Sequence, residues 1–440
     1  MREWQGHALL GLRAAQGMPS EEMALLRPDM SPEKIGKPFM PEIRSVTDML
    51  GAYCLILDWI YQPEFARYCR LENGRWIPHG PAAEDFTAQG TLSMTANHVL
   101  IETLMNALVT ELRAGNWNEA ICRAGVLGHF LQEPFTPGHS MDNTLFEELF
   151  PDPDPTRHIR LHHYFDCASG DFPPPKPRLM GRNVPEAALY LFNEIRSGIA
   201  EGKKLVAPVV QAAYRGKDMK DSEAVRKALL CKQSEWAAFT TASAWHTAFC
   251  IAFDRFDPAE IELLQTFDLV KLTPYFWHPS HYTRLLPDCL VCRGKKVPIE
   301  VWDKDENGEL TRREFTHGFG MYGHSGIKFY INGIFSEIRF KLGMPSGYTD
   351  GQDCHTRLHF AVETDDCENK LFSEDIEYEA KKQVFEVELG AHEPIREIRA
   401  DIAGAKTLIL SSRAVPYTDE KGETRYSVPD LAIIDPVLIP

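Results

Sequence analysis

Apolar residues recur three and four positions apart through the first half of the chain. The pattern is strongest over residues 95–112, 119–131, 185–199 and 222–253. This spacing places the apolar side chains on one face of a helix, where they can pack against a neighbouring helix. The region from about residue 4 to residue 256 is therefore predicted to fold as a helix bundle.

After about residue 280 the pattern changes to short alternating apolar runs. These runs cover residues 327–331, 338–342, 357–362, 384–389 and 407–410. Turn-forming pairs such as Asn332-Gly333 and Asp350-Gly351 separate them, as expected for antiparallel strands. The pattern predicts a multidomain α plus β protein, with an all-α helical domain over 1–256, a linker region over 257–296 and an all-β sandwich over 297–440.

Two proline-rich stretches interrupt the helical pattern at residues 151–155 and 173–177. Both are predicted to be surface loops, because proline lacks a backbone donor and restricts the residue before it. They bracket a histidine-rich segment, residues 157–171.

Composition narrows the classes of function. A chain of 440 residues with 44% apolar and 25% charged residues is expected to form at least two globular domains. The net charge of −16 argues against a protein that coats a nucleic-acid backbone, so no stable nucleic-acid partner is expected. An acidic enzyme can still hold a phosphate through bound cations.

No uncharged apolar run is long enough to span a membrane. Arg2, Glu3 and His7 lie where a signal peptide would need an apolar stretch, so a soluble chain without an export signal is expected. Of the ten cysteines, Cys289 and Cys292 form a single CxxC, which is weak evidence for a metal or redox site.

The strongest chemical signal is the segment GHFLQEPFTPGH, residues 128–139. His129 and Glu133 are four residues apart on a predicted helix, so both face one side and can meet the same cation. Pro134 and Pro137 end that helix, so His139 is expected on the loop beyond it.

A second segment, LHHYFD at residues 161–166, repeats this spacing with His162 and Asp166. One such pair is usually a solvated helix pair, but two pairs together with His139 indicate metal binding. His163 is expected to be a neighbour of the site and not a ligand.

These motifs resemble those of the zinc-dependent phospholipase C and single-strand-specific zinc nuclease superfamily, over about residues 4–255. That family begins with a Trp followed closely by Gly-His, which residues 4–7, WQGH, match. Its upstream Asp corresponds to Asp58 in residues 57–59, LDW, and a further His corresponds to His79 in residues 75–79, RWIPH. His98, with Glu102 one turn later, remains a rival to His79.

The resemblance implies two or three zinc ions in the helical domain. The implied ligands are Asp58, His79, His129 and Glu133 for the first ion, His139, His162 and Asp166 for the second, and His7, Glu133 and the N-terminal residue for the third. It also implies catalytic roles for Asp58, which would orient the attacking water, and for the bridging acid Glu133.

Two departures from the family pattern concern the third ion. The bridging acid is usually Asp, and Glu133 is one methylene longer. The family's leading Trp is the mature N-terminus and binds metal through its amine, whereas Met1, Arg2 and Glu3 precede Trp4 here. Either the true start differs or the third ion lacks that ligand.

The resemblance implies a zinc-dependent phosphodiesterase, with a phospholipase C-like activity slightly preferred. A single-strand-specific nuclease or 3'-nucleotidase is the first alternative, and a non-catalytic glycan-binding protein with a degenerate zinc site is the second. The expected substrate is a phosphoester, either a phospholipid or a nucleotide. The family is usually secreted or periplasmic, which leaves the localisation open because no export signal is seen.

Residues 316–331, THGFGMYGHSGIKFYI, resemble NPCBM-type carbohydrate-binding modules, and the likeness spans about residues 295–440. It implies a galactose-binding-like β-sandwich with a glycan ligand. The segment 303–314 also matches a calcium loop, with its oxygen donors at Asp303, Asp305, Asn307 and Glu314. A strand is predicted before it, so a β-hairpin with its turn at Asn307-Gly308 is the alternative to calcium binding.

Overall fold

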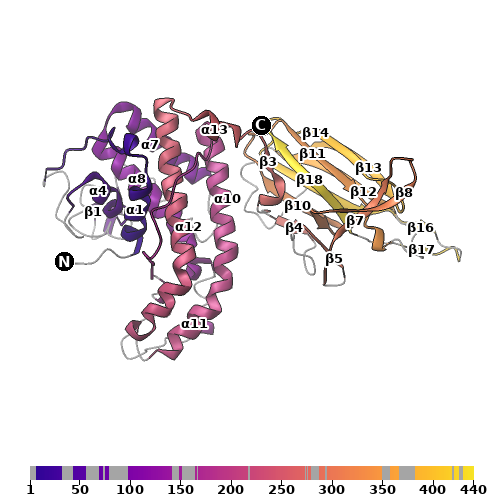
Figure 1. Ribbon diagram of the computed structural model, residues 1–440, viewed down its shortest axis with the longest axis horizontal. Helices are drawn as coiled ribbons and strands as arrows, with labels where there is room; N and C mark the ends of the chain where they lie inside the picture. The colour runs from indigo at the N-terminus through magenta and orange to yellow at the C-terminus, as the bar shows by residue number, and fades with distance from the viewer. Residues whose placement is uncertain are drawn as a thin grey trace. The chain divides into compact units, whose positions relative to one another are not determined.

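The computed structural model describes residues 6–31, 43–55, 69–72, 75–78, 98–140, 148–150, 164–165, 167–216, 219–272, 274, 276–278, 287–292, 295–348, 357–365, 382–418, 421–425 and 430–440. The chain divides into two compact units, Met1–Ile261 and Glu262–Pro440. The first is helical and the second consists of antiparallel sheets (Figure 1). This confirms the predicted fold class.

The helical unit is built from a few long helices and several short ones. Among the described residues its helices are α1 (Gly6–Gly17), α2 (Ser20–Met23), α4 (Val46–Tyr53), α7 (His98–Ala114), α8 (Trp117–Gln132), α10 (Val184–Gly202), α11 (Val206–Arg215), α12 (Met219–Phe253) and α13 (Pro258–Glu262). Two 3-10 turns, η2 (Glu133–Phe135) and η3 (Pro137–Ser140), follow α8, and a short hairpin joins β1 (Cys69–Glu72) to β2 (Arg75–Pro78). The four predicted helices correspond to α7, α8, α10 and α12.

Apolar side chains at helical spacing form the core of this unit. On α7 the buried set is Leu100, Ile101, Leu104, Met105, Leu108, Val109 and Leu112. The long helix α12 packs against α1, α7, α8 and α10, and the fully buried Trp245 donates its indole N–H to the carbonyl of Ala124 on α8 at 2.8 Å. A buried indole N–H needs such a partner, so this bond fixes α12 against α8.

Helices α1, α4 and α8 approach one another closely through glycines. A Cβ at Gly11 would lie 2.5 Å from Sγ of Cys54, and a Cβ at Gly128 would lie 2.8 Å from the same atom. Cys54, which follows α4, is therefore enclosed by the backbones of α1 and α8. This packing sets the position of the backbone at residue 54, which matters for the site below.

The segment from Cys167 to Asn183 has no regular secondary structure and is hydrogen-bonded to α12 at several points. Hydroxyl groups of α12 accept backbone N–H bonds from it: Ser234 from Ser169, Ser243 from Arg178 and Thr247 from Met180. These bonds replace the regular pairing that a proline-rich chain cannot make. The stretch 173–177 is a loop, as predicted.

The second unit contains two antiparallel five-stranded sheets. One has the order β13 (Lys382–Gly390), β12 (Arg357–Asp365), β15 (Thr407–Ala414), β10 (Ser325–Tyr330) and β4 (Phe276–His278). The other has the order β14 (Arg396–Asp401), β11 (Glu337–Gly343), β18 (Leu431–Ile439) and β3 (Phe267–Asp268), with β9 (Gly318–Met321) also paired to β18.

The two sheets face each other through buried aromatic rings. Phe340 of β11 meets Phe360 of β12 edge to face at 5.7 Å between ring centroids, and Phe319 of β9 lies 6.4 Å from Phe329 of β10. All four rings are buried, as expected where the inner faces of a sandwich interdigitate. The turn at Asn332 and Gly333, both at positive φ, is where the sequence places it.

Part of the region expected as a linker, residues 257–296, belongs to these sheets. Strand β3 pairs with β18, β4 pairs with β10, and β5 (Leu290–Cys292) forms a hairpin with β6 (Lys295–Val297). These pairings place the start of the β unit before residue 297. None of the helices that the structure describes is long and apolar enough to cross a membrane.

The calcium alternative at residues 303–314 is wrong, because the segment is a β-hairpin. Strand β7 (Ile299–Lys304) pairs with β8 (Leu310–Phe315). Glu314 lies opposite Glu300, near the end of the hairpin that is distant from the turn between the two strands. The Asp303 carboxylate pairs with Arg313, and Asp305 accepts backbone N–H bonds from Asn307 and Glu309. The four proposed oxygen donors therefore do not converge on one point.

Candidate metal centre

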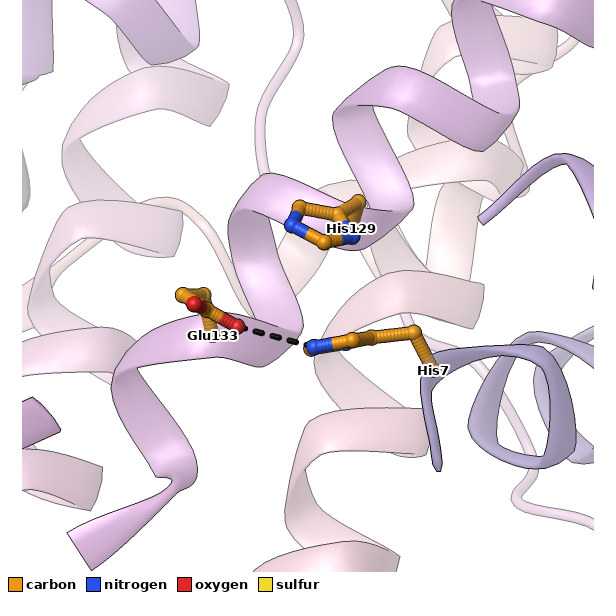
Figure 2. Close-up of side chains that lie close together, drawn as sticks. All are labelled: His7, His129 and Glu133. Atoms are coloured by element: carbon orange, nitrogen blue, oxygen red, sulfur yellow. Dashed lines mark ion pairs between the residues drawn. The ribbon is translucent and has the colours of Figure 1, made fainter. Parts of the chain in front are cut away.

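Three of the predicted ligands come together in the helical unit. His7 lies in the first turn of α1, His129 in the last turn of α8, and Glu133 opens the 3-10 turn η2 (Figure 2). Nε2 of His7 lies 2.8 Å from Oε2 of Glu133, and the two imidazole rings are 4.2 Å apart at their centroids. One ligand atom from each residue falls within 4.8 Å of the others.

The sequence explains how α8 delivers two of these groups. His129 and Glu133 are one helical turn apart, and Pro134 tightens the chain into η2 directly after Gln132. His129 is almost fully buried, whereas the side chain of Glu133 keeps 34% of its surface exposed. The histidine is thus held in the protein interior and the carboxylate faces open space.

A chain of hydrogen bonds orients the ring of His7. The Thr241 hydroxyl donates to the carbonyl of Ala237, so its oxygen can accept a bond from Nε2 of Gln132 at 3.3 Å. The amide of Gln132 must then turn Oε1 toward His7, whose Nδ1 donates to it at 3.1 Å. The other ring nitrogen, Nε2, is therefore the one presented to Glu133.

The ring of His129 is oriented by the backbone. Its Nδ1 lies 2.8 Å from the carbonyl oxygen of Cys54, an acceptor only, so Nδ1 carries the proton and Nε2 carries the lone pair. Burial raises the pKa of the Cys54 thiol to about 12, with the hydrogen bond from Gln132 opposing this effect. The thiol therefore stays neutral, and Cys54 serves the site through its carbonyl.

This donor set fits a zinc ion. Histidines that bind zinc generally donate their second ring N–H to a carbonyl, carboxylate or amide, which fixes the tautomer. The contact between Nε2 of His7 and Glu133 also requires a positive centre between the two atoms, either a proton or a metal ion. Two imidazoles and a carboxylate without a thiolate suit zinc well.

A cavity of about 290 Å³ opens beside His7 and Glu133. Its wall is mixed: Leu10, Leu55 and Phe165 contribute apolar side chains, and Gln233 and Ser234 of α12 add polar groups. Oε1 of Gln233 is buried and has no hydrogen-bond partner among the described residues. The cavity can therefore admit a small polar group next to the three ligands.

The remaining predicted ligands are not tested by this geometry. Asp58, His79, His162 and Asp166 lie outside the described residues, as do His163 and Trp4. His139 lies in η3 and His98 opens α7, but only their backbones are described. Their roles, and the choice between His79 and His98, remain expectations.

Sequence reasoning missed the groups that orient the ligands. Gln132 stands three residues after His129 in the motif itself, so its position on the same helix was available as a signal. The carbonyl of Cys54 and the hydroxyl of Thr241 carry no such signal, because tertiary packing alone brings them to the site.

No family model matches the chain, and no curated protein matches it. Among solved structures, it is similar to Clostridium perfringens alpha-toxin from avian strain SWCP, at 10% identity and a TM-score of 0.29 over 97% of each chain. It is similar to the alpha toxin of Clostridium absonum at 9% identity and a TM-score of 0.28 over 100% of each chain.

The C-terminal part is also similar to a CBM51 module of Clostridium perfringens GH95, solved in complex with methyl-galactose. That likeness has 19% identity and a TM-score of 0.28, and it covers 39% of this chain and 99% of the module. At these identities and TM-scores, the likenesses assign neither an activity nor a ligand to this chain.

Proposed function

We propose that this protein is a zinc-dependent phosphodiester hydrolase of the phospholipase C type. The observation that carries the proposal is the convergence of His7, His129 and Glu133 beside a cavity, with Nδ1 of each histidine engaged by an acceptor. Two oriented imidazoles and a carboxylate presented to a small cavity form a typical hydrolytic zinc site.

The described neighbours of the other expected ligands support a larger cluster. Leu55 lines the cavity three residues before Asp58, Pro137 lines it two residues before His139, and Phe165 and Cys167 line it on either side of Asp166. Three segments that carry expected ligands thus border the same space as His7 and Glu133. We infer that Asp58, His79 or its rival His98, His139, His162 and Asp166 complete a site for two or three zinc ions.

Zinc, when bound, would neutralise the phosphate oxygens and lower the pKa of a bound water to about 7. The protein's own side chains and backbone orient the groups that would bind the metal. Gln132 and the carbonyl of Cys54 fix the two imidazoles, and Glu133 presents its carboxylate to the cavity between them.

A phospholipid fits the cavity better than a nucleic acid does. None of the described residues that line the cavity is Lys or Arg, and the whole chain carries a net charge of −16. Nucleases that track a strand use basic side chains along the backbone and aromatic platforms for the bases. A lipid headgroup needs only one phosphate bound, with apolar walls beside it.

The test compares His129→Ala with the wild-type protein and with His359→Ala. His359 pairs with Glu386 on the β unit, so its variant controls for loss of a histidine. We expect two or three zinc ions at this site, hydrolysis of phosphatidylcholine vesicles by wild type and control, and loss of both metal and turnover in His129→Ala. Hydrolysis of single-stranded DNA but not of lipid would favour the nuclease alternative. Binding of one zinc ion or fewer, without turnover of either substrate, would refute the proposed enzymatic activity.

We further propose that the β unit binds glycan, so that it docks the enzyme on a glycosylated surface. The support is the sandwich architecture together with the NPCBM-like segment 316–331. Titration of the full chain with methyl-galactose, followed by intrinsic fluorescence, tests this. A saturable change supports binding, and none up to millimolar sugar speaks against it.

A further inference from the structure

A second cluster of metal-binding groups lies in the helical unit, away from the cavity. Glu22 of α2, His246 and Cys250 of α12 and Glu260 of α13 surround one imidazole ring. None of the four is among the residues that line the cavity. His246 and Cys250 are one helical turn apart on α12, so that both face the same side.

Each nitrogen of the His246 ring faces a carboxylate. Nδ1 lies 2.7 Å from Oε1 of Glu22, and Nε2 lies 3.2 Å from Oε2 of Glu260. The second oxygen of Glu260 accepts the backbone N–H of Leu179 at 3.2 Å. Glu260 is therefore fully occupied, with one oxygen on the backbone and the other on the imidazole.

Glu22 is different, because its second oxygen, Oε2, is buried and has no hydrogen-bond partner among the described residues. Only 13% of the Glu22 side chain and 10% of the His246 side chain are exposed, and Cys250 is buried. An unpaired buried carboxylate oxygen is costly, and Glu21 and Glu260 add negative charge around it. The cluster holds more negative charge than one imidazolium balances.

We propose that Glu22, His246 and Cys250 bind a zinc ion. Sγ of Cys250 lies 3.9 Å from Nδ1 and 3.6 Å from Nε2 of His246, and one ligand atom from each of the three residues lies within 4.8 Å of the others. In tetrahedral zinc sites a thiolate and an imidazole nitrogen lie about 3.5 Å apart, given bonds of about 2.3 and 2.0 Å. Sγ now lies beside both ring nitrogens, so zinc binding through Nδ1 would require the Cys250 side chain to move Sγ to the Nδ1 side of the ring.

Glu260 completes this arrangement from the opposite side of the ring. Its carboxylate on Nε2 fixes the tautomer that leaves Nδ1 to bind metal, which is the usual way a carboxylate supports a zinc-binding histidine. Zinc binding would displace the proton between His246 and Glu22 and the thiol proton of Cys250. The mixture of sulfur, nitrogen and oxygen ligands selects zinc over calcium or magnesium, which prefer oxygen alone.

The role of this ion is structural. It would join α2, near the start of the chain, to α12, more than two hundred residues later, through side chains that are mostly buried. The site does not depend on the proposed hydrolase, because it shares no residue with His7, His129 or Glu133. Its presence can be tested without measuring turnover.

Cobalt substitution gives the sharpest test, since a cysteine thiolate bound to cobalt produces a strong near-ultraviolet charge-transfer band. The cavity site offers no thiolate among its expected ligands. We expect the band in the cobalt-loaded full chain, its loss in Cys250→Ser, and its retention in Cys231→Ser. Cys231 lies on the same helix but contacts the carbonyl of Asp171 and no imidazole.

Zinc counting provides a second readout. Cys250→Ser and Glu22→Gln should each bind one zinc fewer than the wild type, and Cys231→Ser should bind the full number. A band that survives Cys250→Ser, or an unchanged zinc count, would overturn the proposal. If Cys250→Ser fails to fold, X-ray absorption at the zinc edge provides the test. It is measured on the Cys289→Ser protein, in which the CxxC pair is broken, and it must show a sulfur neighbour of zinc at about 2.3 Å. The absence of that neighbour would refute the site.

Discussion

Gln132 offers the most direct test of how the cavity site is organised. It is completely buried, accepts a bond from His7 at 3.1 Å and donates one to Thr241 at 3.3 Å. Gln132→Met keeps the length and volume of the side chain but removes both bonds. The imidazole of His7 then loses the group that selects its tautomer and holds its plane.

Loss of such an orienting partner typically lowers metal affinity or activity by 10–100-fold, which corresponds to about 1.4–2.7 kcal/mol. We expect zinc affinity, measured by competition with a chromophoric chelator, to fall within this range, and turnover of vesicle phosphatidylcholine to fall with it. Gln233→Met is the matched control for zinc affinity, because Gln233 is a buried glutamine on the same cavity wall, whereas the hydrogen bonds described for His7 and His129 go to Gln132 and Cys54. If Gln132→Met binds zinc as tightly as the control does, the hydrogen-bond chain has no role in the site.

Three further predictions concern packing and charge. Gly128→Ala should lower the free energy of unfolding by about 1–3 kcal/mol in a denaturant titration, because the new Cβ would lie 2.8 Å from Sγ of Cys54. An unchanged midpoint would show that α8 can move away from Cys54 without loss of stability. Arg226 is buried and donates to the carbonyl of Tyr164 at 2.7 Å. Arg226→Met should lower the free energy of unfolding by about 1–3 kcal/mol and should also lower zinc affinity. Equal zinc affinity in the two proteins would mean that other contacts hold the backbone at Tyr164. His317 is partly buried, which opposes charging, but Asp268 and Asp288 outweigh this and raise its pKa above 6.5. The charged imidazole of His317 should therefore contribute fully to the free energy of unfolding below pH 6.5, and this contribution should decline as pH rises through the pKa of His317 in the folded protein. An NMR titration midpoint for His317 at or below pH 6.5, or a midpoint that does not change in Asp268→Asn, would contradict this.

The helical half shows what the sequence could and could not predict. Apolar spacing located α7, α8, α10 and α12, since burial of one face requires that spacing whatever the tertiary contacts are. The pairing of His129 with Glu133 followed from helical geometry in the same way. His7 was found only through the likeness of residues 4–7 to a known family, because nothing local connects α1 to α8.

The β half shows a different limit. Strand positions followed from alternation, yet β3 and β4 are two and three residues long and escaped notice in a region taken for a linker. Strands this short carry no period and are defined only by their pairing with distant strands. The second cluster was missed for a similar reason, as Glu22, His246 and Glu260 are scattered along the chain and only α12 holds two of its members.

The enclosure of Cys54 between Gly11 and Gly128 decides where the cavity site is sensitive to mutation. The acceptor for His129 is a main-chain oxygen, which no substitution at position 54 can delete. Replacement there by another small residue is therefore expected to be tolerated. A single methyl group at either glycine would clash with Sγ of Cys54 and is expected to displace the residue whose carbonyl orients the imidazole, so the centre is sensitive to mutation at two positions that carry no functional group.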